Sequence, residues 1–324
     1  MPLRRFVRWK PTSSTRLFVV IGLLAAVVGL LLNCCSDKPT NPCGGLDAIS
    51  SELLTSPVYS PIDTSVYYFD NGPPKSYFDE FQQNCGAHFT REVPAGIYRV
   101  RLNDDSPAEL VLAEANLPRI SPDGKTMYCI RGAMGEGEIW KMSLPNGEPE
   151  FVTGGDLAFP SWYGPDTLLV LSWEYGISLY DISGDSLINL HINGYSADVS
   201  IDKKICHVWG GSIYVFDSGE DRRLGPGSTY EVLDDLRWSP DGMEITFEGG
   251  SPPQIRVIDL EGRERVLSPG GERDPYFTAD GDSILYIQRT GINTPIILDG
   301  QVWIMSAEDR SHKRPITTWS RIRP

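Results

Sequence analysis

A short turn pattern recurs six times along this 324-residue chain and constrains its fold more than any other feature. The commonest residues of the pattern are Ser, Pro, Asp and Gly. The copies are SPID (60–63), SPDG (121–124), YGPD (163–166), SIDK (200–203), SPDG (239–242) and TADG (278–281). Pro fixes φ early in a tight turn, Asp bonds to nearby backbone groups, and Gly accepts a positive φ. The pattern therefore predicts six hairpin turns.

A second pattern follows each turn, in the same order. Its copies are IYRVRL from Ile97, IWKMSL from Ile139, ISLYDI from Ile177, IYVFDS from Ile213, IRVIDL from Ile255 and VWIMSA from Val302. Successive copies start 42, 38, 36, 42 and 47 residues apart, which suits units of four short strands. In the fifth unit, LRW, MEITFEG, QIRVIDLEG and RERVLS are expected as strands a, b, c and d.

The 32 Gly, 25 Pro and 10% aromatic residues also fit short strands joined by tight turns. A single unit cannot bury both faces of its sheet, whereas six units stacked radially can. Residues 51–324 are therefore predicted to form one all-β domain, a six-bladed β-propeller of four-stranded antiparallel blades. Either ELLT (52–55) or RPITT (314–318) could supply the outer strand that closes the ring.

The combination of an aromatic residue with S-P-D-G, a b strand and I-Y-x-x-D/S resembles the WD-like propeller repeat of the TolB family. The resemblance covers about Ser56 to Thr318 and implies a six-bladed propeller. It implies little about activity, because propellers host scaffolds, hydrolases and lyases alike.

The N-terminus is expected to be an export signal. Residues 1–16 carry five bases and no acid, and an unbroken apolar run follows from Leu17 to Leu32. LLNCC resembles a bacterial lipoprotein signal, with Cys34 as the acylated residue and Cys35 as a second choice, although Asn33 departs from the pattern. The alternative is an uncleaved anchor helix, but 16 apolar residues fall below the about 20 of a comfortable span.

These segments predict the organisation and location of the chain. Residues 1–33 would be the signal peptide, and residues 34–50, rich in Pro and Gly, a flexible tether. The propeller would then be extracytoplasmic and membrane-anchored, as a periplasmic or outer-membrane lipoprotein.

Charge and motifs exclude several classes of function. Without the first 33 residues, 24 bases remain against 43 acids, so nucleic acid is an unlikely partner. The four histidines, which lie in different units, have no zinc-site spacing, and no G-x-S-x-G motif occurs. We expect no catalytic residue, metal or cofactor.

Other candidate residues have structural explanations. The turn acids, Asp241 among them, are expected to shape their turns, and His207 to be a hydrogen-bonded core or channel residue. Asp234 and Asp235 are expected in a solvated turn. Cys129 and Cys206 are expected to be buried thiols, whereas Cys43 and Cys85 flank one blade and are a possible disulfide in an oxidising compartment.

Two long b–c loops, Asn71–Pro94 and Thr290–Gly300, belong to units that are adjacent in a closed ring. They would form a lip on the face opposite the a–b turns. Its aromatic residues Tyr77, Phe78 and Phe81 would either bind a partner or pack the loop onto its own blade. We therefore expect a monomeric propeller that binds or scaffolds an envelope protein or peptide; the alternative is an envelope hydrolase or lyase acting on carbohydrate or peptide in the channel.

Overall fold

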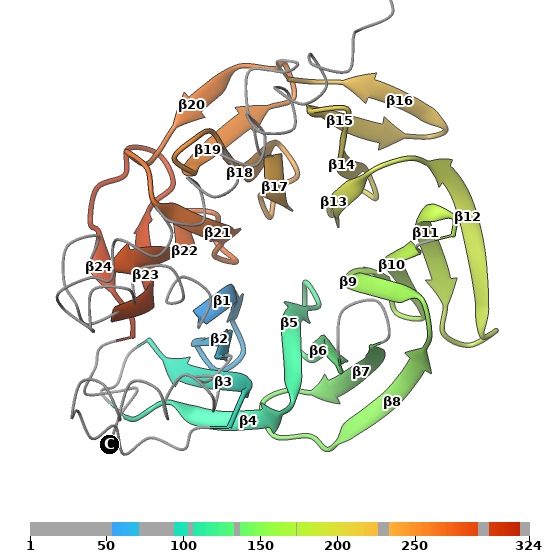
Figure 1. The fold of residues 1–324 in the computed structure, drawn as a ribbon, viewed down its shortest axis with the longest axis horizontal. Coiled ribbons are helices and arrows are strands. Elements are labelled where there is room, and N and C mark those ends of the chain that lie inside the picture. Colours follow the sequence, from blue (N-terminus) through green and yellow to red (C-terminus); the bar gives the residue numbers. More distant parts are fainter. Residues whose placement is uncertain are drawn as a thin grey trace, which may run out of the picture. The chain divides into compact units, whose positions relative to one another are not determined.

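The computed structural model describes residues 54–70, 94–102, 106–132, 137–172, 174–225, 233–290 and 298–317. These residues, all within the compact unit Leu46–Pro324, form six four-stranded antiparallel sheets around a common axis (Figure 1). In every sheet the strands follow chain order from the axis to the rim, so each sheet is one blade with strands a to d. The predicted all-β six-bladed propeller is confirmed.

Each blade consists of four consecutive strands. Blade 1 contains β1 (Leu54–Ser60), β2 (Ser65–Asp70), β3 (Gly96–Arg101) and β4 (Glu109–Ala113). Blade 2 contains β5 (Ala115–Ile120), β6 (Thr126–Arg131), β7 (Glu138–Ser143) and β8 (Pro149–Gly154). Blade 3 contains β9 (Leu157–Gly164), β10 (Thr167–Ser172), β11 (Gly176–Asp181) and β12 (Ser186–Ile192). Blade 4 contains β13 (Tyr195–Val199), β14 (Ile205–Trp209), β15 (Ser212–Asp217) and β16 (Glu220–Arg223). Blade 5 contains β17 (Leu233–Trp238), β18 (Glu244–Gly249), β19 (Gln254–Asp259) and β20 (Glu264–Val266). Blade 6 contains β21 (Glu272–Phe277), β22 (Ser283–Thr290), β23 (Leu298–Ser306) and β24 (Arg314–Pro315).

The core lies between blades and not within any one of them. Among the described residues there are six apolar clusters, one at each contact between neighbouring blades, including the contact of blade 6 with blade 1. The alternation of side chains along the b and c strands produces this arrangement: in β6, Cys129 packs toward blade 1 and Ile130 toward blade 3. Each sheet therefore buries both faces, which a single blade could not do alone.

A bulge interrupts the innermost strand of every blade. At each bulge one residue has a positive φ of about 50°, and the pairing with strand b shifts register there. These residues are Ser56, Leu117, Phe159, Ser196, Asp235 and Asp274. Bulges bend a strand and re-aim the side chains that follow. The six bulges therefore set the direction of the residues around the axis.

The ring closes without exchange of strands in the described part of the chain. Leu54 and Thr55 belong to β1, the innermost strand of blade 1, so the reading of ELLT as an outer strand is wrong at these two residues. The outer strand of blade 6 is β24, within the predicted RPITT segment. Apolar packing between blades 6 and 1 and a hydrogen bond from the Ser56 N–H to Asp274 Oδ2, 2.9 Å long, hold this seam.

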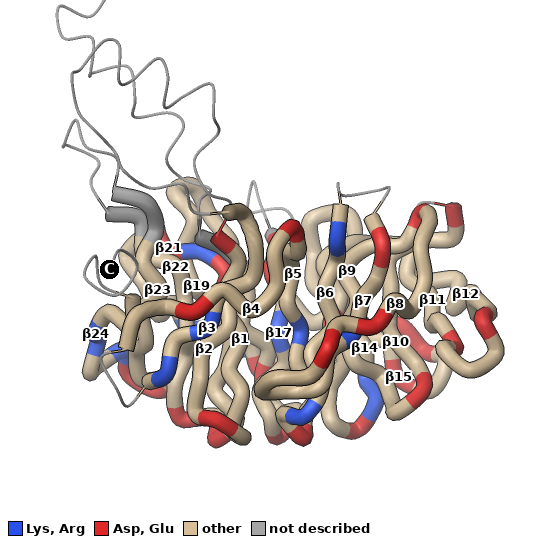
Figure 2. Tube along the Cα trace, turned by 90° about the horizontal axis from the view of Figure 1, so that it is seen from below, with Lys and Arg blue, Asp and Glu red and all other residues tan. Residues whose placement is uncertain are grey.

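Strand direction separates the connections onto two faces. The a–b turns and c–d connections lie on one face, which we call the turn face; the b–c and d–a connections lie on the opposite face. Acidic segments occur along both edges of the disc in Figure 2, with Lys and Arg between them. No helix in the described ranges is long and apolar enough to cross a membrane. The predicted signal, anchor helix and tether lie outside these ranges.

Candidate functional site

The residue two positions before each turn lies at an equivalent place on the innermost strand of its blade. Each of these residues follows the bulge and pairs with strand b. We call the six the axial layer: Val58, Arg119, Ser161, Asp198, Arg237 and Tyr276. Four of them carry ionisable groups, although the neighbouring strands pack mostly apolar side chains. The ring thus has a polar interior at this level.

Asp198 of the axial layer joins three blades. Its Oδ1 accepts a hydrogen bond of 2.6 Å from the Ser161 hydroxyl in blade 3, and its Oδ2 accepts one of 3.0 Å from the Trp238 backbone N–H in blade 5. The Trp238 indole donates to the backbone carbonyl of Asp198 at 3.3 Å. Both carboxylate oxygens are therefore engaged, and Asp198 acts as a structural link.

Two arginines of the axial layer are buried and come from opposite blades. Arg119 and Arg237 expose only 7% and 6% of their surface. Arg119 donates to the carbonyl of Pro118 at 2.9 Å and has no carboxylate within ion-pair distance among the residues described. Arg237 lies 3.5 Å from Asp235 Oδ1. Burial and the charge of Arg237 lower the pKa of Arg119 to about 10.

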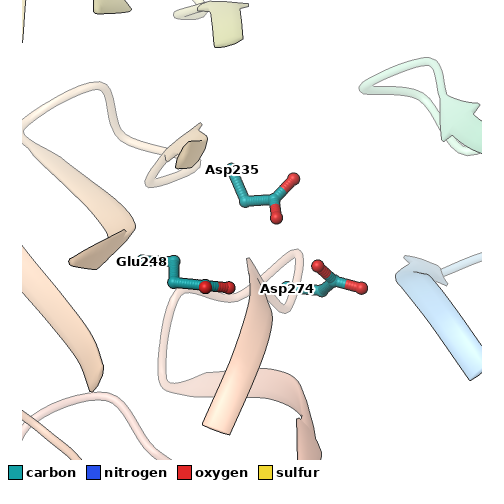
Figure 3. Close-up of side chains that lie close together, drawn as sticks. All are labelled: Asp235, Glu248 and Asp274. Atoms are coloured by element: carbon teal, nitrogen blue, oxygen red, sulfur yellow. The ribbon is translucent and has the colours of Figure 1, made fainter. Parts of the chain in front are cut away.

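Three carboxylates converge beside these arginines. Asp235, Glu248 and Asp274 come from β17, β18 and β21, and Figure 3 shows their side chains directed toward a common space. One oxygen of each lies within 4.8 Å of the others. Burial, followed by the charge of Asp274, raises the pKa of Asp235 to about 7. Burial and the charge of Asp235 likewise raise the pKa of Glu248 to about 7.

The position of Asp235 corrects one prediction from the sequence. Asp234 and Asp235 were expected in a solvated turn, but both lie in the inner strand β17. Asp234 is exposed, whereas Asp235 sits at the bulge and faces the axial arginines and acids. Adjacent side chains in a strand point to opposite sides of the sheet. The prediction treated the two acids as a single turn and did not consider that they could have different surroundings.

The three carboxylates are the one group in the described ranges with the spacing of a metal site. Carboxylate oxygens suit Mg²⁺ or Ca²⁺. However, positive charge is already present, since the Arg273 Nε lies 3.7 Å from Glu248 and Arg237 lies beside Asp235. Protonation of one carboxyl group relieves the remaining repulsion without an ion. The arrangement is thus suited to proton uptake or release near neutral pH.

The turn acids behave differently, as the sequence predicted for Asp241. In four copies the hydroxyl at the first turn position donates to the Asp at the third, at 2.5 to 2.6 Å; these acids are Asp123, Asp202, Asp241 and Asp280. Asp241 also accepts from the Met243 N–H at 3.0 Å, and both bonds lower its pKa. Their contacts are those of a turn-forming residue.

Two turn acids are not equivalent to the others. Asp63 accepts hydrogen bonds from the Tyr67 hydroxyl at 2.9 Å and from the buried Arg99 at 3.4 Å. Asp166 accepts the Ile182 N–H through its backbone carbonyl. Both occupy the fourth position of their motifs. The alignment of six equivalent acids therefore holds for four.

The remaining predicted residues divide into described and undescribed ones. His207 is buried in β14, where its Nε2 lies 3.0 Å from Asp221 Oδ1, in agreement with a hydrogen-bonded core histidine. Cys129 and Cys206 are buried free thiols, as predicted. The following residues lie outside the described ranges: Cys34, Cys43, Cys85, Tyr77, Phe78 and Phe81.

The axial residues were not predicted, although the sequence holds a signal for them. The position two residues before each turn reads Val, Arg, Ser, Asp, Arg and Tyr around the ring. A repeat position that varies in charge while its neighbours keep their character is typical of a site and not of a core. Four of the bulges also precede a proline, namely Pro57, Pro118, Pro160 and Pro275.

Comparison with known proteins identifies the fold. No protein-family model matches the sequence, and no curated protein was found to match it. TolB from Acinetobacter baumannii superimposes with a TM-score of 0.56 at 20% identity, covering 78% of this chain and 76% of that protein. The putative TolB from Agrobacterium tumefaciens gives 0.52 at 20% identity, over 65% and 84% of the two chains.

A peptidase shares the same architecture. The acylaminoacyl peptidase from Pyrococcus horikoshii gives a TM-score of 0.50 at 13% identity, covering 86% of this chain and 54% of that one. At these identities the likeness concerns the fold alone. The protein is a six-bladed β-propeller structurally similar to the TolB propellers.

Proposed function

We propose that this protein is a membrane-anchored, extracytoplasmic binding or scaffolding module whose protein partner docks on the face opposite the turn face. The predicted N-terminal signal with Cys34 supports the location, and the six-bladed fold shared with TolB supports a binding or scaffolding module. The surface chemistry of the two faces supports the choice of face.

The single observation that carries the proposal is the distribution of exposed aromatic side chains. Tyr175 and Tyr195 are each 45% exposed and Trp209 is 51% exposed, and all three lie on the face of the b–c and d–a connections, in blades 3 and 4. On the turn face the exposed large apolar residues are aliphatic: Ile62, Ile201 and Met243. Aromatic residues are enriched where proteins bind one another.

The predicted lip would extend the same face. Strands β2 and β22 both end there, at Asp70 and Thr290, where the two long loops begin. Blades 1 and 6 are neighbours in the ring, as the prediction of one continuous lip required. The partner surface proposed here therefore runs over blades 3 and 4 and includes the lip.

The test is capture of partners from envelope extract with the full chain. Removal of residues 73–92, or the double change Tyr175→Ala and Trp209→Ala, is expected to reduce recovery of a specific partner at least about tenfold. The matched control is Ile201→Ala with Met243→Ala, which trims exposed apolar surface on the turn face. Equal recovery by all variants would contradict the proposed face.

A second candidate is an enzyme with its site at the axial layer, because Arg119 and Arg237 converge there with acids of raised pKa. Assays of the full chain with peptide and polysaccharide substrates test it. Product formation that disappears in Arg119→Gln and in Asp274→Asn would support an enzyme. Product formation that survives both changes, or no turnover, would reject a site at the axis.

A further inference from the structure

A hollow of about 570 Å³ opens between blades 3 and 4 on the face opposite the turns. Three segments build it: the β10–β11 hairpin, the end of β12 with the connection that follows, and the first residue of β13. This volume is in the range of sites that hold a small molecule or one to two sugar units. It lies apart from the axial layer and contains none of its residues.

Two tyrosines flank the hollow from adjacent blades. Tyr175 comes from the hairpin of blade 3 and Tyr195 from the start of blade 4, and each leaves nearly half of its surface open. Tyrosine offers a flat apolar ring together with a hydroxyl group that can bond to a ligand. Aromatic rings of this kind pack against the apolar C–H face of a sugar ring. The two rings thus supply the apolar part of a carbohydrate site.

The polar lining is almost entirely uncharged. Ser172, Asn189, His191 and Asn193 contribute hydroxyl, amide and imidazole groups, and Glu174 is the only charged residue among the described residues that line the hollow. None of the described lining residues is Lys or Arg. Phosphate and carboxylate ligands would lack a counter-charge here, whereas amide groups both donate to and accept from sugar hydroxyls.

Local hydrogen bonds position this lining before any ligand arrives. Ser172 Oγ accepts the N–H groups of Glu174 and Tyr175, each at 3.3 Å, and so shapes the hairpin. Asn189 Oδ1 accepts the His191 N–H at 2.6 Å, where the φ of His191 is 58°. The neighbouring Glu174 carboxylate raises the pKa of Tyr175. Prior positioning lowers the entropy lost on binding.

Two glycines that line the hollow lie in close contact with the protein packed against them. A Cβ at Gly176 would lie 2.7 Å from the Ile192 carbonyl oxygen. At Gly194 it would lie 2.7 Å from the Val208 carbonyl oxygen and 2.8 Å from Nδ1 of the buried His207. No side chain fits at either position without displacement of backbone atoms. Close packing against the backbone therefore requires glycine at both of these lining positions.

From this combination we infer that the hollow between blades 3 and 4 binds a neutral saccharide. The paired tyrosines select a ring with an apolar face, the amides and hydroxyl select its hydroxyl groups, and the lone carboxylate disfavours acidic sugars. This adds a small-ligand site to the proposed partner face and does not require a protein partner.

The test uses the full 324-residue chain and four neutral probes: maltotriose, cellotriose, chitotriose and xylotriose. Saturable binding of at least one probe is expected in titration calorimetry. Tyr175→Ala and Tyr195→Ala should each weaken it at least about tenfold. Phe151→Ala, which removes an exposed ring from the rim strand β8, is the matched control and should leave it unchanged. Thermal melting would confirm that each variant remains folded.

Two further arms separate this inference from the proposed function. Trp209→Ala should weaken capture of a protein partner but not of the saccharide, since Trp209 does not line the hollow. Trigalacturonate, an acidic probe, should bind more weakly than the best neutral one. The inference is overturned if no neutral probe binds up to about 10 mM, if both tyrosine variants bind as well as the parent chain, or if the acidic probe binds best.

Discussion

Asp235 and Asp241 lie six residues apart, on strand β17 and in the turn that follows it, yet their surroundings shift their pKa values in opposite directions. Asp241 accepts hydrogen bonds from the Ser239 hydroxyl and the Met243 N–H, which lower its pKa. Asp235 is half-buried beside Asp274, and its pKa rises to about 7. The hydrogen bonds of Asp241 come from its own hairpin, whereas the pKa of Asp235 depends on a residue of another blade.

This contrast separates two kinds of acid in a repeat protein. The turn arrangement recurs in four blades with the same bond lengths to within 0.1 Å. The axial arrangement occurs once, because the residues that meet at the axis differ from blade to blade. The repeated turn acids have the same structural role in four blades, whereas the residues at the axis differ in charge and polarity from blade to blade.

The largest expected effect is on stability at the axis. Asp198→Ala removes the bonds to Ser161 and Trp238 and leaves the buried arginines with less negative charge around them. We expect the free energy of unfolding to fall by about 3–5 kcal/mol, measured by denaturant titration. Asp202→Ala, four residues away in the turn of the same blade, is the control. Equal losses would remove the distinction between the two regions.

The pH dependence of stability should come next in size. A carboxyl group whose folded-state pKa exceeds its unfolded value is destabilising when ionised, so the free energy of unfolding should rise as pH falls through about 7. For Asp235 and Glu248 together we expect a gain of about 2–4 kcal/mol between pH 8 and 5.5. Urea unfolding at fixed pH values measures it.

Variants identify the groups responsible for that slope. Asp235→Asn should flatten it by about half. Asp241→Asn should leave it unchanged, because its lowered pKa places its titration below this range. His207 acts in the opposite sense: burial lowers its pKa, so the folded state loses stability as pH falls toward and below the ordinary histidine value. A wild-type slope that Asp235→Asn does not change would contradict the assignment.

A smaller effect should follow from the turns themselves. Asp241→Ala removes two bonds within one hairpin and should lower the free energy of unfolding by about 1–2 kcal/mol in thermal or urea unfolding. The control is Asp166→Ala, at a turn where the backbone and not the carboxylate makes the hydrogen bond. If both changes cost the same, the hydroxyl–carboxylate pair is not what stabilises the turn.

The smallest expected effect is a difference between two turn glycines. Gly124 and Gly281 have φ values of 74° and 78°, so Ala strains both equally. A Cβ at Gly124 would also lie 2.9 Å from Pro61 of the preceding blade, whereas at Gly281 the nearest atom is 3.7 Å away. Gly124→Ala should therefore be less stable than Gly281→Ala by about 0.5–1 kcal/mol. Equal melting temperatures of the two variants would show that the contact between Gly124 and Pro61 of the neighbouring turn does not affect stability.

Much of the fold could be predicted because each blade repeats the residues that build it. The turn residues and the second repeated pattern, which begins with Ile or Val in the c strands, marked the start and direction of each unit. The alternation of side chains along each b strand predicted that both faces of a blade would be buried against neighbouring blades. The closure of the ring was harder. ELLT has the character of an outer strand, but its last two residues are in β1, and only the packing of blade 6 against blade 1 decides between these places.

The axial site could not be assembled from the sequence in the same way. Arg119 and Arg237 are 118 positions apart in a chain of 324 residues and belong to opposite blades, so only a closed ring brings them together. The bulges at Leu117 and Asp235, which aim these side chains, depend on a backbone angle that no residue type there demands. The hollow between blades 3 and 4 likewise arises from three separate segments.

The seam between blades 1 and 6 has a mechanical consequence. Within the described part of the chain, every strand pairs only with strands of its own blade, so no ladder of backbone bonds ties the first blade to the last. A pull on the two ends of the ring would act on side-chain packing and on the bond from Ser56 to Asp274. We therefore expect the contact between blades 1 and 6 to separate before any other blade contact when the ring is pulled. Asp274, one of the three clustered carboxylates, lies at this contact.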